Sequence, residues 1–254
     1  MGITVRNAVV ALVAVAGAAG MSAAADTIMA KYDVFLDPGF NVQAKILNSV
    51  PGPGPVFLDT GAAQIDGRRQ DLPAGPGENP DIALNFPTFC LEIDAPIDVS
   101  VGGGFAGSTL THLVFNLLGG TTDDGGVTGP ITFGASRTQR LERLWGSFYD
   151  PSMQTNLTTA TAFQLAVWEI AYEPEAGALD VYDALSQFSI FNGPNAEGNL
   201  ANAWLATVDA AGPETALYLL VNEDFQDLIT PVPTPGAAAI GGLGIAACLR
   251  RRRR

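Results

Sequence analysis

Histidine and cysteine are nearly absent from the 254 residues of the chain, which holds one histidine, His112, and two cysteines, Cys90 and Cys248. A zinc site built from such ligands needs about four of them. A Ser-His-Asp triad would have to use His112, which has no nucleophile-elbow motif near it. Asp123 and Asp124 lack the spaced acidic ladder of a calcium loop, and we interpret them as a solvated turn. The sequence therefore predicts no enzyme, no cofactor and no metal site.

Basic residues are also scarce, with 13 lysines and arginines against 26 acidic residues and a formal net charge of −13. Arg6 and the five arginines at the end lie in segments that we expect to be removed, which leaves a formal net charge of −19. Nucleic acids and anionic lipids bind clustered lysine and arginine, so this surface disfavours both. We expect no nucleic-acid partner and interpret the charge as a source of solubility outside the cell.

The N-terminal segment has the pattern of a secretory signal peptide. Arg6 precedes an apolar run at 8–21, and small residues follow at 22–25, where a signal peptidase cuts. The apolar run is shorter than the roughly 20 residues that span a bilayer. We therefore expect residues 1–25 to be a signal peptide that is removed before Asp26.

The C-terminal segment, 230–254, has three parts. Pro233, Thr234 and Pro235 lead into a small apolar run at 237–249. At about 1.5 Å per residue this run reaches about 20 Å, short of a hydrocarbon core of roughly 30 Å, so it would be a weak permanent anchor. The positive-inside rule predicts that the terminal arginines stop transfer through the inner membrane. These arginines are Arg250, Arg251, Arg252, Arg253 and Arg254.

This tail resembles the PEP-CTERM sorting signal of bacteria that have an outer membrane and make exopolysaccharide. Thr234 stands where the commonest form of the signal has glutamate. The resemblance implies an exosortase-type processing enzyme as a partner, transient insertion into the inner membrane, and cleavage near the Pro-Thr-Pro motif. The product would be released to the cell surface or the extracellular matrix.

Residues 26–229 are expected to form one globular domain. The 29 glycines and 17 prolines of the whole chain predict many turns between short elements. A Gly/Pro-rich loop is expected at 61–80, and apolar or alternating runs predict strands at 32–36, 40–47, 55–58, 88–93, 97–101 and 109–118. Helical spacing predicts helices at 137–149, 156–172 and 199–211, before a closing strand at 216–221. The prediction is an α+β fold, a β-rich sandwich or barrel frame with a helical insert in the second half.

Cys90 and Gln164 are the two residues of this domain that require an explanation. Cys248 lies in the apolar tail, so Cys90 would be a free thiol, pair between chains, or react chemically. Gln164 is flanked by apolar residues and on a helix would share a face with Val167 and Trp168. A buried amide without a partner costs about 1 to 3 kcal/mol, so we expect Gln164 to meet one.

The pair Phe89-Cys90, followed by the run Gln-Leu-Ala-Val-Trp at 164–168, resembles the motifs of the Cys-Gln thioester-forming surface domains. In that family an aromatic-Cys strand motif pairs with a helical Gln-x-Ala-Ile/Val-Trp motif; Phe163 stands here where many members have Thr. The resemblance implies an internal thioester between Cys90 and Gln164, shielded by Phe89 and Trp168. An amine or hydroxyl of a surface protein or exopolysaccharide would attack it once, giving covalent adhesion without turnover.

The residues also allow a reading without covalent chemistry. Cys90 would then be a small buried hydrophobe and Gln164 a hydrogen-bonded polar residue of the core. The protein would be a passive structural component of the exopolysaccharide or envelope layer. The sequence leaves both readings open, and it leaves open whether Glu92, Glu169 or His112 assists bond formation.

Overall fold

The computed structural model describes residues 26–34, 41–46, 56–62, 64–70, 85–93, 99–101, 105, 107–122, 129–191 and 193–233. The predicted signal peptide and the tail from Thr234 onward lie outside these residues, as do Asp123 and Asp124. Pro233 is the last residue described. Within the described ranges, no helix is long and apolar enough to cross a membrane.

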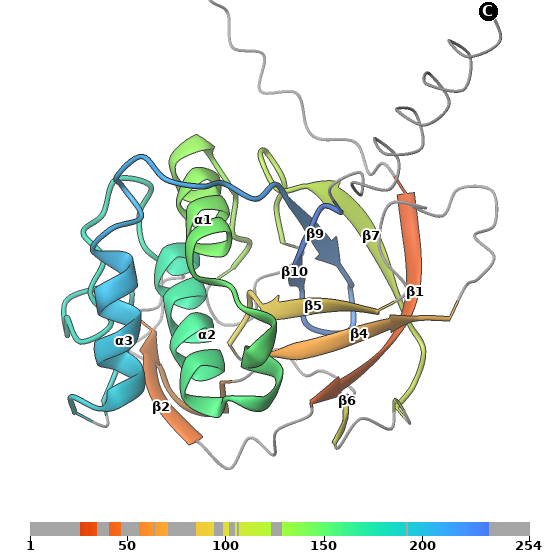
Figure 1. Cartoon of the computed structure of the whole chain (residues 1–254), viewed down its shortest axis with the longest axis horizontal. Coiled ribbons are helices and arrows are strands. Elements are labelled where there is room, and N and C mark those ends of the chain that lie inside the picture. Colours follow the sequence, from red (N-terminus) through yellow and green to blue (C-terminus); the bar gives the residue numbers. More distant parts are fainter. Residues whose placement is uncertain are drawn as a thin grey trace, which may run out of the picture.

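Six antiparallel strands close into a barrel on one side of the molecule (Figure 1). The barrel closes because β1 pairs along one edge with β7 and along the other with β4. A short strand, β6 (Val99–Val101), runs parallel to β1. The arrangement confirms the α+β class and a barrel as its frame. In order around the barrel, the strands are β4 (Ile65–Arg69), β5 (Asn85–Cys90), β10 (Leu228–Pro231), β9 (Leu217–Val221), β7 (Leu110–Asn116) and β1 (Asp26–Val34).

Alternate residues of the strands fill the barrel, as the pleat of a strand requires. On β7, Leu110, His112 and Val114 are buried while the residues between them are exposed. The ring of Tyr32 on β1 meets His112 edge-on at 5.4 Å between ring centroids, and Phe86 on β5 at 6.3 Å. The histidine is therefore a core residue of the barrel.

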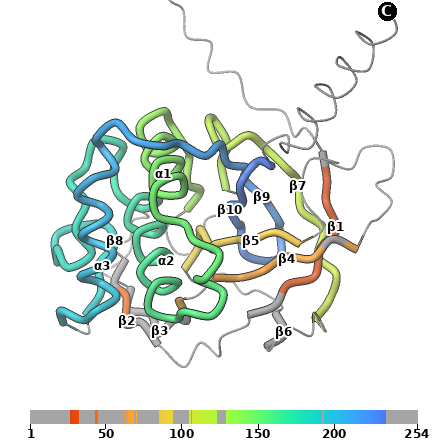
Figure 2. Tube along the Cα trace, in the orientation of Figure 1, coloured from red at the N-terminus to blue at the C-terminus, as the bar shows by residue number. Residues whose placement is uncertain are grey.

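The helices of the described residues lie beside the barrel, and the central one, α2, lies between α3 and the barrel strands (Figures 1 and 2). Every residue of α2 from 160 to 172 is buried, which is typical of a helix that is apolar on all sides. It contacts α1, α3 and β5, and also β8 of a second antiparallel sheet. These elements are α1 (Ala135–Phe148), a 3₁₀ turn η2 (Pro151–Thr155), α2 (Leu157–Tyr172) and α3 (Ala196–Leu205), with a sheet of β3 (Val56–Gly61), β2 (Asn41–Ile46) and β8 (Phe188–Ile190).

Several sequence predictions are corrected by the structure. The segment 61–80 is predicted to be a loop, yet 65–69 form β4, which pairs with β1 and β5. Glycine is required at 67, because a Cβ there would lie 2.3 Å from the ring of Phe86. The strand predicted at 88–93 ends at Cys90. The helix predicted at 156–172 begins at Leu157, because Asn156 is its N-cap. Strands β8 and β10 were not predicted, since runs of three and four residues show no periodicity.

Candidate functional site

Cys90 and Gln164 meet where the barrel joins the helices. Cys90 ends β5, Gln164 lies near the middle of α2, and the exposed fractions of the two residues are 7% and 1%. The side-chain amide of Gln164 pairs with the main chain of Cys90. The Cys90 N–H donates to Gln164 Oε1 at 2.9 Å, and Gln164 Nε2 donates to the Cys90 carbonyl at 2.8 Å. The buried amide thus has the partners that its burial demands.

The thiol of Cys90 contacts a second glutamine, Gln226, which was not predicted from the sequence. Cys90 Sγ donates to Gln226 Oε1 at 2.8 Å, and Gln226 Nε2 donates to the main-chain carbonyl of Glu92. Gln226 is 4% exposed and lies just before β10. The polar turn that carries it has no periodic pattern, so only the pairing of β10 with β5 reveals its position, with Leu228 opposite Cys90.

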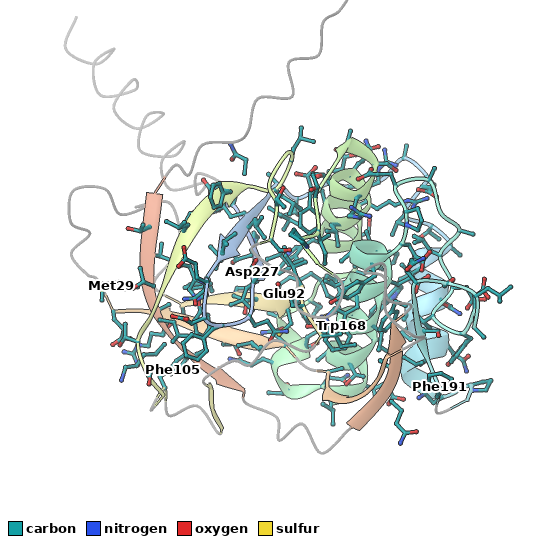
Figure 3. All side chains as sticks on the ribbon, turned by 180° about the vertical axis from the view of Figure 1, so that it is seen from behind. Met29, Glu92, Phe105, Trp168, Phe191 and Asp227 are labelled. Atoms are coloured by element: carbon teal, nitrogen blue, oxygen red, sulfur yellow. The ribbon has the colours of Figure 1, made fainter. Side chains whose placement is uncertain are left out.

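The turn at 222–227 is fixed to the strands on both sides. Asn222 donates through Nδ2 to the Thr111 carbonyl on β7 at 2.7 Å. The Asp227 N–H donates to Glu92 Oε2 at 3.0 Å, and the Leu91 N–H donates to the Asp227 carbonyl at 3.0 Å. Figure 3 shows Glu92 and Asp227 together where barrel and helices meet, with Trp168 on the helical side. These contacts hold Gln226 at a fixed place over the Cys90 sulfur.

The surroundings of Cys90 keep its sulfur protonated. Burial raises the pKa of the Cys90 thiol far above its usual range, and the negative charge of Glu92 raises the pKa further. The hydrogen bond to Gln226 acts in the opposite direction and lowers the pKa. At neutral pH the residue is therefore a thiol whose hydrogen is directed at Gln226.

The two residues predicted to shield the site are both buried. The ring of Phe89 packs against Phe163 and Trp145, at 4.5 Å and 5.6 Å between centroids. Because side chains alternate along a strand, Phe89 lies on the opposite face of β5 from the Cys90 side chain. Trp168 lies one helical turn after Gln164, is 1% exposed and approaches Phe188 at 6.1 Å. Phe163 is thus part of the aromatic contact between α2 and β5, and the shielding role of Phe89 and Trp168 stays a prediction.

Glu169 and His112 make contacts elsewhere. Glu169 Oε1 accepts the N–H of Asp180 at 2.7 Å, and His112 faces Tyr32 inside the barrel. Burial lowers the pKa of His112 to about 4, so its ring is neutral at physiological pH. Of the three residues left open by the sequence, Glu92 is the one whose charge acts on Cys90. In the described part of the chain, no group of three or more His, Cys, Asp or Glu side chains is arranged to hold a metal ion.

No family model matches the sequence, and no curated protein matches it. Among solved structures, the chain is similar to the N-terminal thioester domain of a surface protein from Clostridium perfringens. The two chains share 14% identity, and the match covers 80% of this chain and 97% of the other with a TM-score of 0.36. A likeness this remote carries no functional conclusion, so the chemistry has to be inferred from the contacts around Cys90.

Proposed function

We propose that this protein is an exported surface or matrix module in which Cys90 and Gln164 form an internal thioester for covalent attachment to a partner. The observation that carries the proposal is the double hydrogen bond between the Gln164 amide and the Cys90 main chain in a buried site. The fold thereby holds the two residues next to each other, although they lie 74 positions apart in the chain. Such fixed proximity is what makes an otherwise slow acyl transfer feasible.

Bond formation is an exchange at the Gln164 side-chain carbon, Cδ. The Cys90 sulfur attacks Cδ, the bond between Cδ and Nε2 breaks, and Nε2 leaves as ammonia with the thiol proton. The hydrogen bond from the Cys90 N–H to Oε1 polarises the carbonyl and stabilises the negative charge that develops on this oxygen. The sulfur first has to turn away from Gln226 Oε1, its present hydrogen-bond partner, toward Cδ.

Capture of a partner breaks the thioester bond between Gln164 Cδ and the Cys90 sulfur. An amine or hydroxyl attacks Cδ, an amide or ester forms, and Cys90 recovers its thiol. Burial of Cys90 and Gln164, with Phe89 and Trp168 nearby, would exclude water until the partner arrives. The predicted signal peptide and the PEP-CTERM-like tail would deliver the module to the cell surface or matrix, where exopolysaccharides and surface proteins offer such nucleophiles.

One observation favours the alternative of a passive structural component. The Gln164 amide is already hydrogen-bonded through both its oxygen and its nitrogen, so it stabilises the contact between β5 and α2 without a covalent bond. In that case the protein would hold an envelope or exopolysaccharide layer by non-covalent contacts alone. The two functions differ only in whether the purified protein reacts with nucleophiles.

Capture of a fluorescent primary amine separates the two functions. The wild-type protein is expected to become labelled in denaturing gels, whereas Cys90→Ala and Gln164→Ala are expected to remain unlabelled. Gln139→Ala, which removes an exposed glutamine on α1, serves as the control and should label like the wild type. Labelling of Gln164→Ala, or no labelling of the wild type, would disprove the covalent mechanism.

A further inference from the structure

Gln226 is the residue of the site whose role the thioester chemistry leaves unassigned. Its amide is fixed at one end, because Nε2 donates to the Glu92 carbonyl. Its other end, Oε1, accepts the hydrogen of the Cys90 thiol at 2.8 Å. With 4% of its surface exposed, Gln226 is nearly cut off from water.

Formation of the thioester would remove this donor. A thioester sulfur carries no hydrogen, so Gln226 Oε1 would be left as a buried acceptor next to the reactive bond. Leaving such a buried acceptor without a donor is unfavourable. The turn at 222–227 is held to β7 and to the segment after β5, which opposes a movement of Gln226 to another partner.

We propose that Gln226 Oε1 binds the incoming nucleophile by accepting its N–H or O–H hydrogen, and so positions it for attack on the thioester. This assignment rests on the proposed function. Gln226 then serves in both states of the site: it accepts the thiol hydrogen before the bond forms and the nucleophile's hydrogen afterwards. The hydrogen of the nucleophile then replaces the Cys90 thiol hydrogen at Oε1, which places the attacking atom near the sulfur that becomes the leaving group.

The step balances without any added reagent. The nitrogen of a primary amine attacks Gln164 Cδ, the bond between Cδ and Cys90 Sγ breaks, and one amine proton ends on the sulfur. Gln226 gains and loses no proton, since an amide oxygen only accepts the hydrogen bond. The restored thiol can return to Gln226 Oε1, the contact seen in the structure.

The ratio of the rates of amine capture and thiolate capture is a quantity that a purely structural role of Gln226 would leave unchanged. A thiolate attacks the same thioester carbon but has no hydrogen to donate, so Gln226 gives it no help. We would measure, on the full chain, the rate at which the preformed thioester is consumed by methylamine and by the thiolate of ethanethiol, which has no N–H or O–H group. Gln226→Met keeps the length of the side chain and removes the acceptor, and Gln139→Met is the matched surface control.

The expected result is that Gln226→Met slows methylamine capture about tenfold, the effect of one lost hydrogen bond, while thiolate capture and the control variant keep their wild-type rates. Equal slowing of both nucleophiles, or of neither, would overturn the assignment. If Gln226→Met does not fold, Gln226→Asn withdraws the oxygen by one methylene and is judged by the same ratio of amine capture to thiolate capture. A wild type that never loses ammonia would refute the thioester itself. A wild type that loses ammonia, together with a Gln226 variant that captures methylamine at the wild-type rate, would refute only the role of Gln226.

Discussion

Cys90 is held through its main chain as well as through its sulfur, and this determines how variants of the site will behave. Replacing Cys90 by alanine removes the sulfur but keeps the N–H and C=O groups that pair with Gln164. Replacing Gln164 by alanine leaves those two buried groups without partners, at a cost of about 1 to 3 kcal/mol each. Cys90→Ala is therefore the cleaner test of the chemistry, and loss of stability in Gln164→Ala alone says nothing about a thioester.

Glu169 makes the stability of the fold depend on pH. Burial is the main cause that raises the pKa of its carboxyl from 4.5 to about 8; the hydrogen bond from the Asp180 N–H lowers this pKa, and the charges of neighbouring acidic side chains raise it. The folded state thus holds an extra proton between these pH values. The contribution of protonated Glu169 to the free energy of unfolding is complete below pH 4.5 and is lost as the pH rises toward 8. At about 1.4 kcal/mol per pKa unit, the loss at pH 7 is on the order of 3 kcal/mol.

Glu169→Gln should remove this dependence, because the amide is neutral at every pH and its Oε1 can still accept the Asp180 N–H. Urea unfolding at pH 5 and pH 8 measures the effect. The variant should match the wild type at pH 5 and exceed it in free energy of unfolding at pH 8. Glu223→Gln, an exposed position, is the control. Parallel curves for wild type and Glu169→Gln would contradict the assignment.

At the scale of elements, α2 is fixed at both ends, and this places Gln164 opposite Cys90. Asn156 Oδ1 accepts the Thr159 N–H at the start of the helix. Arg137 holds the other end: Nε donates to the Ile170 carbonyl at 3.2 Å and a terminal nitrogen donates to the Glu173 carbonyl at 2.6 Å. A cation here also complements the partial negative charge of the helix C-terminus.

Arg137→Met is expected to lower the free energy of unfolding by about 2 to 3 kcal/mol, since it removes hydrogen bonds from a charged group to helix-end carbonyls. Arg68→Met, an exposed arginine on β4, is the control. The guanidinium of Arg68 lies 5.7 Å from the centroid of the Phe105 ring, and an exposed contact of this kind is worth about 1 kcal/mol or less. Urea unfolding compares the two, and an equal loss in both variants would show that Arg137 does not hold α2.

The sequence predicts long periodic elements well and short ones poorly. The helix expected at 156–172 is found as α2 at Leu157–Tyr172, because the helical spacing of its apolar residues is a local signal. Strands β4 and β10 depend on pairing with distant residues, and no local pattern reveals them. For the same reason the motifs at Cys90 and Gln164 could be found from the sequence, whereas Gln226 could not: its contact with Cys90 spans 136 positions.

At the scale of the whole molecule, the proposed thioester would tie the barrel to the helices through β5 and α2. A cross-link between residues 74 positions apart restricts the unfolded chain. For a disulfide with a loop of that size, the chain-entropy model gives about 4 kcal/mol. Attack by an amine cuts the link while leaving the hydrogen-bond network around it largely in place.

Capture of methylamine is therefore expected to lower the Tm of the wild-type protein by several degrees, because the link is lost while the fold remains. Differential scanning calorimetry before and after treatment measures the change. Cys90→Ala has no link to lose and should keep its Tm on treatment. A wild-type Tm that stays constant or rises while methylamine is incorporated would show that the link does not stabilise the fold.

The central claim is tested most directly by the intact mass of the purified protein under non-reducing conditions, with and without methylamine, followed by fragmentation. The thioester predicts a mass low by one ammonia, a shift to the methylamine adduct on treatment, and the methylamine located on Gln164. Cys90→Ala should show its full mass in both samples. A full mass for the wild type, with a Cys90 thiol that reacts with an alkylating reagent after unfolding, would contradict the covalent mechanism.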